Sequence, residues 1–566
     1  MVRGIYNNQL SLDTVGHNIT NANTEGYSRQ RVNPAATRPL EQGGMFGGLF
    51  VGTGVDSESL TRARDFFADK QYWQEEATES YAKYRQKNYD KIEAVFNDSK
   101  TKGLQNAMHK FYSAWNDLSV YASDPAKRVS VVESGKQFAD RLEESAQNVQ
   151  KQLDLVYREM DTQVKDVNEI TQKIVELNKN ISLAEANGAM ANDLRDKRDL
   201  LVDKLSGYMS LHVYEMDNGM YQVVSGGASI VNGVSRLELK MDGPVENKRY
   251  GVNDYSLIFK DTNTLFVPGN GTLQAAVDSI KEDKAYMDKL ANIAATFMTQ
   301  FNAQHRAGAG IDKDATSNLN FFGEQDKYYV WDKERQSLLA AKVTGTTSTT
   351  AGTPPVTTHT TTLSTTAGDT EELQGLQIIK AMKVSAELVA QNGELKVAAR
   401  GFGDNSDAKN SYVQNLGYNN ATIPPNITGT GTIVHTTSDR NGTADGSNAI
   451  LLTNIFNMEQ KDTGLSIYKN PTETRPIGTS SLNNYYNSVT SALGIDSNAM
   501  DTKVKFQEDV MTQIQTWRTS VSGVNWNEEL SNMIKFQQGY SASARCLTTM
   551  DEMLDRLVNN TGLVGR

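Results

Sequence analysis

The hydrophobic residues at the two ends of the chain recur with helical periodicity. Near the start, Ile5, Leu12, Val15 and Ile19 fall at heptad spacings, and Asn8 completes the row. A similar row near the other end comprises Phe536, Tyr540, Leu547, Met550, Leu554 and Leu557. Such stripes predict amphipathic helices that pack as a coiled coil. Because a helix as short as residues 3–20 is marginal in water, we expect the ends to order only where neighbouring subunits surround them.

The longest periodic run predicts a single helix over residues 142–181. Its apolar positions recur every three or four residues; they are Leu142, Ala146, Val149, Leu153, Val156, Met160, Val164, Val167, Ile170, Ile174, Leu177 and Ile181. A helix of this length spans roughly 60 Å, which suits a rod or a bundle better than a compact core.

Shorter periodic runs predict further helices. They cover residues 60–97, 103–121, 190–208, 272–305 and 500–521. The last of these helices carries one apolar face, which consists of Phe506, Val510, Ile514, Trp517 and Val521. The molecule should therefore be largely helical outside its middle part.

The middle of the chain changes character. Residues 211–267 alternate apolar and polar positions between turns rich in Asn and Gly, which predicts hairpins and a small β domain. From about 323 to 475 the helical signal largely vanishes. Within it, residues 343–368 hold thirteen threonines, and such a stretch cannot bury a core. We expect it to be an exposed loop or extended segment; attachment of glycans to its hydroxyls is the alternative.

Composition and charge narrow the range of partners. A chain of 566 residues is too long for one core, so three or four domains of ordinary size are expected. The net charge of -11, with acidic and basic residues interspersed, disfavours nucleic acid or an anionic membrane as the main partner. The sequence contains no apolar run long enough to span a bilayer and no N-terminal apolar signal segment, so composition alone would place the protein in the cytoplasm.

The search for catalytic chemistry finds little. The six histidines are scattered singly, without metal-ligand spacing, and the one cysteine, Cys546, lies in an apolar helical pattern that predicts a small buried hydrophobe. Gly135 and Lys136 lack the rest of a phosphate-binding loop. Carboxylates three or four residues apart are expected to be solvated helix faces. We therefore expect no catalytic residue, no cofactor and no metal.

The segment 17–30 is more informative because it crowds amide side chains where the first helix should end. Asn18, Asn21 and Asn23 tolerate left-handed backbone and can cap turns, and Gly26 supplies a positive φ without steric cost. A helix stop followed by a tight turn explains the glycine. It does not explain so many amides in so short a space.

The residues after this turn complete the pattern. Tyr27 is expected to pack back against the helix, while Arg29 and Arg31 should face water. The order Asn-Ile-x-Asn-Ala-Asn-Thr-x-Gly-Tyr resembles the N-terminal signature of the flagellar axial proteins, which are rod, hook and hook-associated proteins. The positions that carry this resemblance are Asn18, Asn21, Asn23, Thr24, Gly26 and Tyr27.

Other parts of the chain support the same resemblance and narrow it. The continuation Ser28, Arg29 and Gln30 is more similar to the hook-associated family of the hook–filament junction than to rod or hook proteins. The C-terminal run 522–555 and internal blocks resemble that family in the same order; the blocks are 192–205, 301–305 and 480–486. The resemblance covers roughly 1–322 and 475–566. Family members usually carry a further stretch before the position that matches Val2, so the first turns of the inner helix are expected to precede Met1.

The resemblance implies an α+β multidomain fold with a terminal coiled coil, a bundle of long helices and β-rich outer domains. The terminal coiled-coil assembly domain is expected to consist of 1–24 with 524–566, and the helical bundle of 25–210 with 271–322 and 476–523. A small β subdomain is expected over 211–270. The remainder, 323–475, is expected to form a variable outer domain that contains a Thr-rich loop at 343–368.

The resemblance also implies a function. Family members are secreted structural subunits that join the hook to the filament and assemble through their terminal helices after type III export. The expected interface residues are Leu12, Val15, Ile19, Phe536, Tyr540, Leu547 and Leu554. The implied partners are further copies in a ring, the hook protein, the second hook–filament junction protein, and a cytoplasmic export chaperone at the C-terminal region.

Three alternatives remain at this stage. A hook or rod protein would share the Asn-rich signature without the C-terminal block. A filament cap or adhesin-like protein would fit the Thr-rich middle but not residues 18–30. An enzyme in the middle would need His359 or His435 beside Glu371, Glu387 or Asp439, and their spacings give no support.

Overall fold

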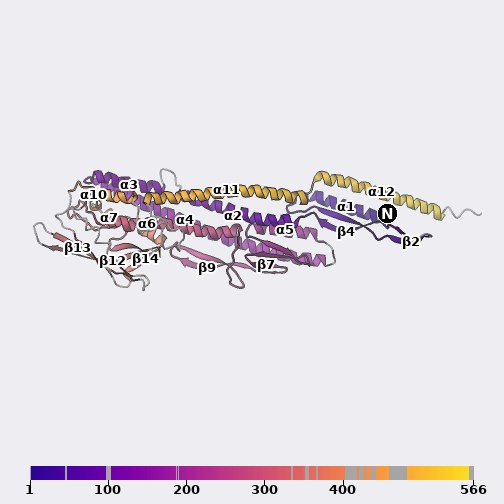
Figure 1. Cartoon of the computed structure of the whole chain (residues 1–566), viewed down its shortest axis with the longest axis horizontal. Coiled ribbons are helices and arrows are strands. Elements are labelled where there is room, and N and C mark those ends of the chain that lie inside the picture. Colours follow the sequence, from indigo (N-terminus) through magenta and orange to yellow (C-terminus); the bar gives the residue numbers. More distant parts are fainter. Residues whose placement is uncertain are drawn as a thin grey trace, which may run out of the picture.

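The computed structural model shows an elongated molecule with a long rod and a narrower arm at one end (Figure 1). The two ends of the chain meet in the arm, although most of the sequence lies between them. The structure describes residues 2–44, 47–96, 103–186, 188, 190–332, 335–350, 356–364, 368–401, 417–419, 426–428, 430–434, 442–457 and 481–559.

Long helices run along the rod. They are α2 (Phe66–Phe96), α3 (Leu104–Val120), α4 (Pro125–Glu185), α6 (Gly271–Thr296) and α11 (Leu482–Ser522). Shorter helical elements join them: α5 (Asn192–Ser206), the π-helical turn η1 (Phe297–Phe301), α7 (Asn302–Arg306), α8 (Leu376–Ala381), α9 (Ala386–Val389), the 3-10 turn η2 (Gly393–Lys396) and α10 (Ser447–Asn457). The helices expected over 103–121, 190–208 and 272–305 are confirmed. Helix α2 begins at Phe66 rather than near residue 60, because the residues before it form a strand.

Helix α4 confirms the long helix expected from the sequence and extends it. At 61 residues it is about 90 Å long. Its N-cap residue Asp124 accepts a hydrogen bond from the Ala126 amide, and Pro125 occupies the first helical position. The expected stripe between residues 142 and 181 faces the core, although Ile170 and Leu177 are only half-buried. The helix thus forms one continuous wall of the rod.

Aromatic rings fill the core at the end of the rod far from the arm. The ring of Phe111 on α3 lies 5.4–6.3 Å, centroid to centroid, from the rings of Trp115, Phe138, Phe297, Phe301, Phe321, Phe322 and Phe456. Gly135 faces this cluster, and a Cβ there would lie 2.7 Å from the Phe321 ring. Gly135 therefore allows close packing of α4 on the aromatic core.

The β subdomain expected over 211–267 is confirmed. Strands β5 (His212–Glu215), β6 (Tyr221–Ser225), β7 (Ala228–Asn232) and β8 (Ser235–Arg236) form one antiparallel sheet, and β9 (Leu239–Asn247) pairs with β10 (Val252–Phe259). Gly226 and Gly227 in the β6–β7 turn both have positive φ, as a tight hairpin turn requires. The buried residues of these strands share one core with α2, α4 and α6. The subdomain therefore packs onto the rod.

The far end of the rod carries a second, antiparallel sheet. Its strands are β11 (Lys327–Asp332), β12 (Ser337–Thr350), β13 (Val356–Leu363), β14 (Thr370–Leu373) and β17 (Thr430–Val434), and a separate pair is β15 (Gly417–Asn419) with β16 (Asn426–Thr428). The Thr-rich segment lies in β12 and β13, which pair from Val343 with Leu363 to Thr350 with Val356. It is therefore an extended hairpin rather than a loop. Residues 351–355 and 365–367 lie outside the described residues.

Several described residues of the expected outer domain over 323–475 share the core of the bundle. Leu338 of β12, Leu376 of α8 and Phe456 of α10 are buried in the same cluster as Phe111. These late segments thus complete the core that the long helices begin, and the expected division at residue 323 stays a prediction. The sequence hid this because their apolar runs are short and separated by polar turns.

The arm consists of two helices and a strand ribbon. Its elements are α1 (Val2–Thr20), α12 (Trp526–Asn559), β1 (Gln30–Ala36), β2 (Leu40–Gly44), β3 (Gly47–Val51) and β4 (Val55–Arg62). Strand β1 pairs with β4 and β2 with β3, and α1 packs against α12, β1 and β4. Residues 30–62 thus belong to the arm, which corrects the expected boundary between residues 24 and 25.

Helix α11 extends well beyond its expected range of 500–521 and buries a different face. The side chains that face α2 are Val504, Gln507, Met511 and Ile514. In contrast, Phe506 is 66% exposed, and Trp517 and Val521 remain more than one-third exposed. Of the apolar face expected from the sequence, Ile514 is buried and Val510 is half-buried, whereas the other three side chains remain exposed.

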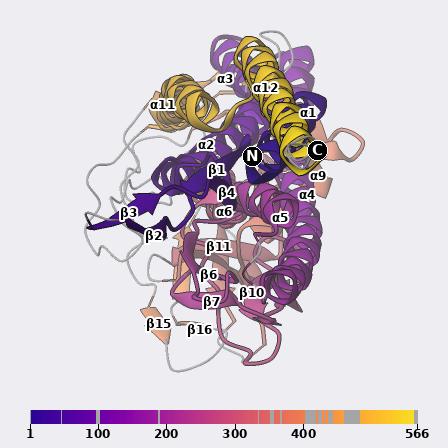
Figure 2. The same cartoon turned by 90° about the vertical axis from the view of Figure 1, so that its right-hand side faces the viewer.

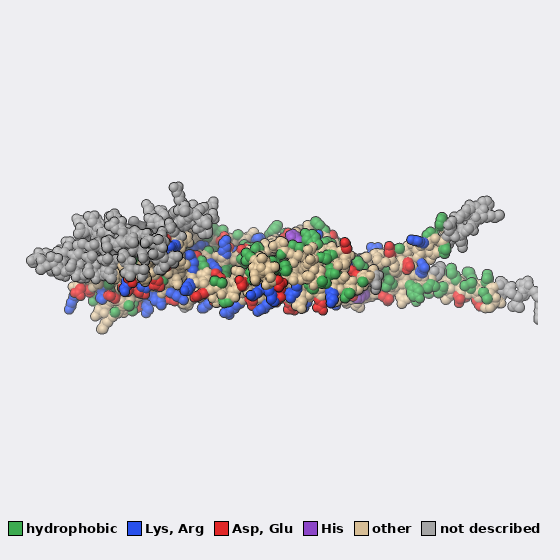
Figure 3. Space-filling view, turned by 90° about the horizontal axis from the view of Figure 1, so that it is seen from below, with side chains coloured by type: hydrophobic (Ala, Val, Ile, Leu, Met, Phe, Trp, Pro, Cys, Tyr) green, Lys and Arg blue, Asp and Glu red, His purple; other side chains and the backbone are tan. Residues whose placement is uncertain are grey.

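The view along the rod separates two sides of the molecule. In Figure 2, α11, α12 and α1 lie on the upper side, and strands β6, β7 and β10 lie on the lower side. Figure 3 shows charges of both signs mixed over the rod, whereas hydrophobic side chains gather on the arm. No helix among the described residues is both long and apolar enough to cross a bilayer.

Candidate functional site

The signature segment forms the turn that joins α1 to β1. Helix α1 ends at Thr20, where the Asn21 side chain donates to the His17 carbonyl at 3.0 Å and so caps the helix. Among the signature residues only Gly26 has a positive φ, of 78°. The interpretation of the asparagines as left-handed residues is therefore wrong. Asn23 and Thr24 are exposed on the turn.

Asn18 is the centre of this turn, and it is only 1% exposed. Its Oδ1 accepts hydrogen bonds from the Gln30 amide at 2.9 Å and from the Tyr27 hydroxyl at 2.8 Å. Its Nδ2 donates to the Gln30 carbonyl at 2.9 Å and to Glu529 Oε2 at 3.2 Å. The Asn18 side chain thus bonds the backbone N–H and C=O of Gln30, as a neighbouring strand would, and its bond to Glu529 links both ends of the chain. Only an amide side chain offers this combination of donor and acceptor.

Arg29 joins the same two ends and does not face water as expected. Its Nη2 lies 2.8 Å from Glu528 Oε1, and its Nε lies 2.7 Å from Glu529 Oε1. Its backbone amide donates to the Ser522 carbonyl at 2.9 Å, at the end of α11. Glu529 is only 1% exposed, so its charge depends on Arg29. Arg31, in contrast, is exposed as expected.

A buried ionic network lies where the arm meets the rod. Its members are Arg62, Arg64, Arg518, Asp69, Asp196, Asp199 and Asp203. Arg62 Nη1, at the end of β4, lies 2.7 Å from Asp196 Oδ1 and 2.7 Å from Asp199 Oδ2 on α5. Asp196 also accepts a hydrogen bond from the Ser28 amide at 2.9 Å. The network therefore fixes the ribbon of the arm to the first helices of the rod.

The other half of the network ties α11 to the same place. Arg518 Nε lies 2.9 Å from Asp69 Oδ1, and its Nη2 lies 2.9 Å from Asp203 Oδ2. Arg64 Nε reaches Asp69 at 2.6 Å. Three parts of the chain that are distant in sequence (β4 with the start of α2, α5, and α11) thus meet in one cluster, which we call the joint.

Electrostatics at the joint depend on burial and on the arginines. Burial alone would raise the pKa of Asp199, but the charges of Arg64 and Arg62 outweigh it and hold this pKa below its usual range. For Asp203 burial prevails over Arg518 and Arg64, and its pKa is raised. The expectation that closely spaced carboxylates form solvated helix faces therefore fails here.

The sequence contained a signal for the joint. Asp196, Asp199 and Asp203 recur at spacings of three and four, which places them on one face of α5. The same helix contains few apolar residues that could cover the rod. When the acidic face of a helix packs against the rest of the protein, its carboxylates need cationic partners on the facing elements. The arginines at positions 62, 64 and 518 are these partners.

The expected interface residues differ in exposure. Val15 is buried, and Leu12, Ile19 and Phe536 are half-buried between the arm helices and the ribbon. On α12, Tyr540 and Leu547 are each 39% exposed, and Leu554 is 60% exposed. The same helix exposes Met550, Met553, Leu557 and Val558. The N-terminal members and Phe536 are therefore at least half-buried in the single chain, whereas Tyr540, Leu547 and Leu554 are exposed. Cys546 is also exposed, which contradicts the expected buried position.

Helices α1 and α12 lie antiparallel, yet their paired part still shows apolar surface. A Cβ on Gly539 would lie 3.0 Å from Asn8, and one on Gly4 would lie 3.8 Å from Ser543. These glycines allow close approach of the two helices. Along the paired length Tyr6 is 67% exposed and Ile534 is 56% exposed. Two helices alone thus cannot cover the apolar side chains of the arm.

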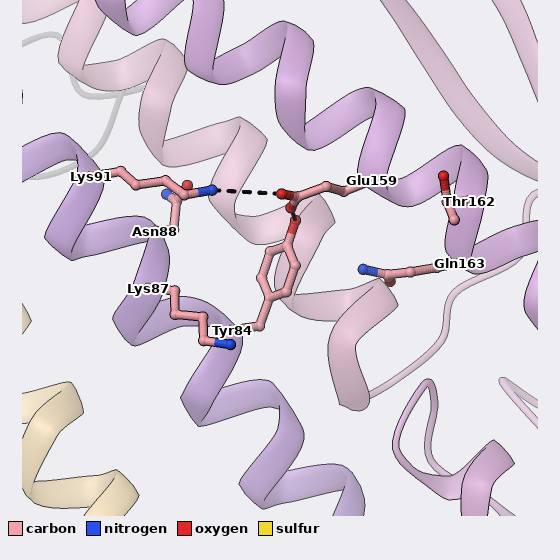
Figure 4. Close-up of a pocket in the computed structure, with 7 residues that line it drawn as sticks. All are labelled: Tyr84, Lys87, Asn88, Lys91, Glu159, Thr162 and Gln163. Atoms are coloured by element: carbon pink, nitrogen blue, oxygen red, sulfur yellow. Dashed lines mark hydrogen bonds and ion pairs between the residues drawn. The ribbon is translucent and has the colours of Figure 1, made fainter.

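A polar groove of about 370 Å³ opens between α2 and α4 (Figure 4). Lys91 lies 3.6 Å from Glu159, and the Tyr84 hydroxyl donates to Glu159 at 2.7 Å. Next to it, Asn88 donates to the buried Asp283 at 2.8 Å, and burial raises the pKa of Asp283 to about 7. The remaining lining residues are Lys87, Thr162 and Gln163. The polar side chains of this groove thus pair with one another and join α2 to α4.

We also searched the described residues for side chains that could bind a metal ion. Within the described ranges, no group of three or more His, Cys, Asp and Glu side chains is arranged to hold a metal ion. His305 is fully buried in the aromatic core, where burial lowers its pKa to about 4. Of the residues considered for an enzyme, His435 and Asp439 lie outside the described residues.

Two family models match the chain. Residues 89–322 match the one described as the flagellar hook-associated protein FlgK helical domain, and residues 518–560 match the flagellar basal body rod FlgEFG protein C-terminal. The first covers most of the rod helices. The second covers the end of α11 and all of α12, the C-terminal helix of the arm.

Curated relatives match over almost the whole chain. The chain is 26% identical over 600 residues to flagellar hook-associated protein 1 of Bacillus subtilis (strain 168), covering 100% of this chain and 98% of the relative. It is 25% identical over 575 residues to the protein of the same name from Salmonella typhimurium, covering 97% of each. A solved structure, that of the flagellar hook junction protein FlgK from Burkholderia pseudomallei, has a similar fold, with a TM-score of 0.56 at 18% identity over 80% of this chain and 100% of that one.

The two family models and the relatives indicate a structural component of the bacterial flagellum, with paired terminal helices joined to a helical rod. Over almost its whole length the chain is similar to proteins named flagellar hook-associated protein 1, and residues 89–322 match the helical-domain model of that family.

Proposed function

We propose that this protein joins the hook to the filament as a subunit that assembles through its arm after type III export. The observation that carries the proposal is the apolar surface of α12, where Leu547, Leu554 and Leu557 are 39%, 60% and 64% exposed in the single chain. Large exposed apolar side chains in a row mark a surface that another molecule covers. Heptad spacing indicates that the covering surface is helical.

The energetics favour an assembly of many copies. Full burial of one large apolar side chain stabilises by roughly 1.5–3 kcal/mol, so covering the exposed halves of six such side chains contributes roughly 5–9 kcal/mol per subunit. This is comparable to the stability of a whole domain. In this proposal the arms of neighbouring copies cover each other in a ring, and the free protein keeps its arm largely uncovered.

The joint supports a structural role for the arm. Asn18 and Arg29, near the start of the chain, contact Glu529 of α12 near its end. The buried charges of the joint connect the ribbon to α5, and connect α11 to the same cluster. A force that acts on the arm would thus be transmitted to the rod through ion pairs rather than through a flexible linker. We propose the hook protein and the second hook–filament junction protein as axial neighbours, and an export chaperone that covers the C-terminal region before export.

Electron microscopy of a strain that lacks this protein tests the proposal. The expected result is intact hooks without filaments, with unassembled flagellin in the medium, and return of filaments when the gene is restored. Loss of the hooks themselves would favour a rod or hook role instead. Filaments that remain attached in the deletion strain would overturn the junction role.

A further inference from the structure

The apolar core of the rod is divided in two by a layer of polar side chains. One core contains the aromatic rings around Phe111, and the other joins α2, α4 and α6 to the β subdomain. On α4 the first core ends at Val149 and the second begins at Leu153, and on α6 the two are separated between Ile280 and Tyr286. Buried polar side chains occupy this level of the rod, and we call them the polar layer; they are Arg85, Asn88, Gln152, Ser279 and Asp283.

A chain of hydrogen bonds crosses the polar layer from α4 through α2 to α6. Gln152 Nε2 donates to Asn88 Oδ1 at 2.8 Å, and Asn88 Nδ2 donates to Asp283 Oδ1 at 2.8 Å. Asp283 is fully buried, yet its Oδ2 has no hydrogen-bond partner among the described residues. An ionised carboxylate accepts hydrogen bonds at both oxygens, and burying it without them is costly. The layer therefore suits a neutral carboxyl group better than an ionised one.

The cations near Asp283 pair with other carboxylates. Arg85 of α2 forms an ion pair with Glu282 of α6, and Lys91 of α2 lies 3.6 Å from Glu159 of α4. Further titratable groups at this level of the rod are Tyr84, Tyr89, Tyr286 and Asp496. In the part of the chain that the structure describes, Asp283 has no ion pair of its own. Ionisation of Asp283 would thus add a negative charge next to Glu282 without adding an attractive partner.

Asp283 can exchange a proton near neutral pH. Burial raises the pKa of Asp283 to about 7, and the charge of Glu282 adds to the rise. The hydrogen bond from Asn88 and the charges of Arg85 and Lys91 oppose this rise without cancelling it. Water can bring protons close to the layer, because Asn88 also lines the polar groove between α2 and α4 (Figure 4).

Apolar contact across the polar layer is limited. Among the described residues, Tyr250 alone packs against both cores, and it is only half-buried. We propose that the polar layer is a proton-dependent latch between the two halves of the rod: a proton on Asp283 keeps the layer closed, and its loss lets each half open separately. This latch is a property of the rod and does not depend on what the arm contacts.

Hydrogen exchange followed by mass spectrometry, with rates corrected for the intrinsic effect of pH, tests the latch. The closed layer holds a proton that the open, solvated layer releases, so stability falls as pH rises toward 7. Between pH 5 and 8 the equilibrium constant for opening should therefore rise about a hundredfold in peptides that cover 85–92 and 279–286. Peptides from 131–149 and from 153–170, on the two sides of the layer, should open with different free energies.

Three variants separate the latch from ordinary loss of stability. Asp283→Asn keeps a neutral group of the same shape, so opening should no longer depend on pH over this range. Asn88→Asp should move the dependence to higher pH, because two adjacent carboxyl groups then share one proton. Asp261→Asn, in an exposed turn, is the matched control and should behave like the unmodified protein. An unchanged pH dependence in Asp283→Asn, no shift in Asn88→Asp, or halves that open together at every pH would overturn the proposal.

Discussion

Replacing Asn18 with alanine should loosen the base of the arm without unfolding the rod. The substitution removes the partners of the Gln30 amide, the Gln30 carbonyl and the Tyr27 hydroxyl, and Gln30 is only 6% exposed. An unpaired buried polar group costs about 1–3 kcal/mol. Water can enter as the turn relaxes and can hydrogen-bond some of these groups, so we expect the free energy of opening the turn to fall by about 2–4 kcal/mol in total. The equilibrium constant for opening should then rise about 30- to 700-fold.

Amide hydrogen exchange followed by mass spectrometry measures this opening. Peptides that cover residues 14–30 and 524–532 should exchange faster in Asn18→Ala, while peptides from α4 keep the rate of the unmodified protein. Asn23→Ala is the matched control, because Asn23 belongs to the same signature but is exposed. Asn18→Asp should be at least as damaging, since it places a second carboxylate beside Glu529.

Two results would refute this reasoning. Equal exchange in Asn18→Ala and Asn23→Ala would mean that the buried amide does not hold the turn. Faster exchange throughout α4 would mean that the turn and the rod unfold together, so the arm could not open independently.

Further predictions concern the rod and the free arm. The raised pKa of Asp283, about 7 against 3.8, means that the folded protein binds the extra proton between about pH 4 and 7, so stability falls as pH rises through this window. Asp283→Asn should flatten that fall and raise the free energy of unfolding at pH 8 by an amount on the order of 4 kcal/mol, which a higher melting temperature would report. Deletion of 343–368 should leave thermal stability and motility near normal, because a segment of this Thr-rich composition offers no apolar face to the core; blocked filament growth would make it a contact site. Trypsin should cut free protein first at Arg545 and Arg556 of α12, and equal resistance of free and assembled protein would contradict an uncovered arm.

The sequence predicted the elements whose pattern of apolar or turn residues repeats along the chain. Helix α4 was visible because its apolar residues recur without interruption for many turns, and the β subdomain was visible because its turns need glycine. The apolar face of helix α11 was visible in the sequence, but Phe506 on this face is exposed, whereas the polar Gln507 is buried. Periodicity reports that a face is apolar and does not say whether the same chain or another covers it.

The polar part of the site was harder to predict. Asn18 and Gly26 were identified from the signature, but Glu529, which pairs with both Asn18 and Arg29, comes from the other end of the chain, and pairing across hundreds of residues leaves no local pattern. The acidic face of α5 looked like an ordinary solvated surface. Its burial depends on arginines from β4 and α11, which only the three-dimensional arrangement brings together.

The most direct test of the central claim is the substitution Leu554→Asp in the arm. Leu554 is 60% exposed in the single chain, so the free protein should keep its melting temperature. In an assembly that covers this residue, burying an unpaired charge costs several kcal/mol, and filament attachment should be lost. Thr549→Asp, on another face of α12, is the control and should still attach filaments. Attached filaments in Leu554→Asp cells, with the variant present at the hook tip, would contradict assembly through the arm.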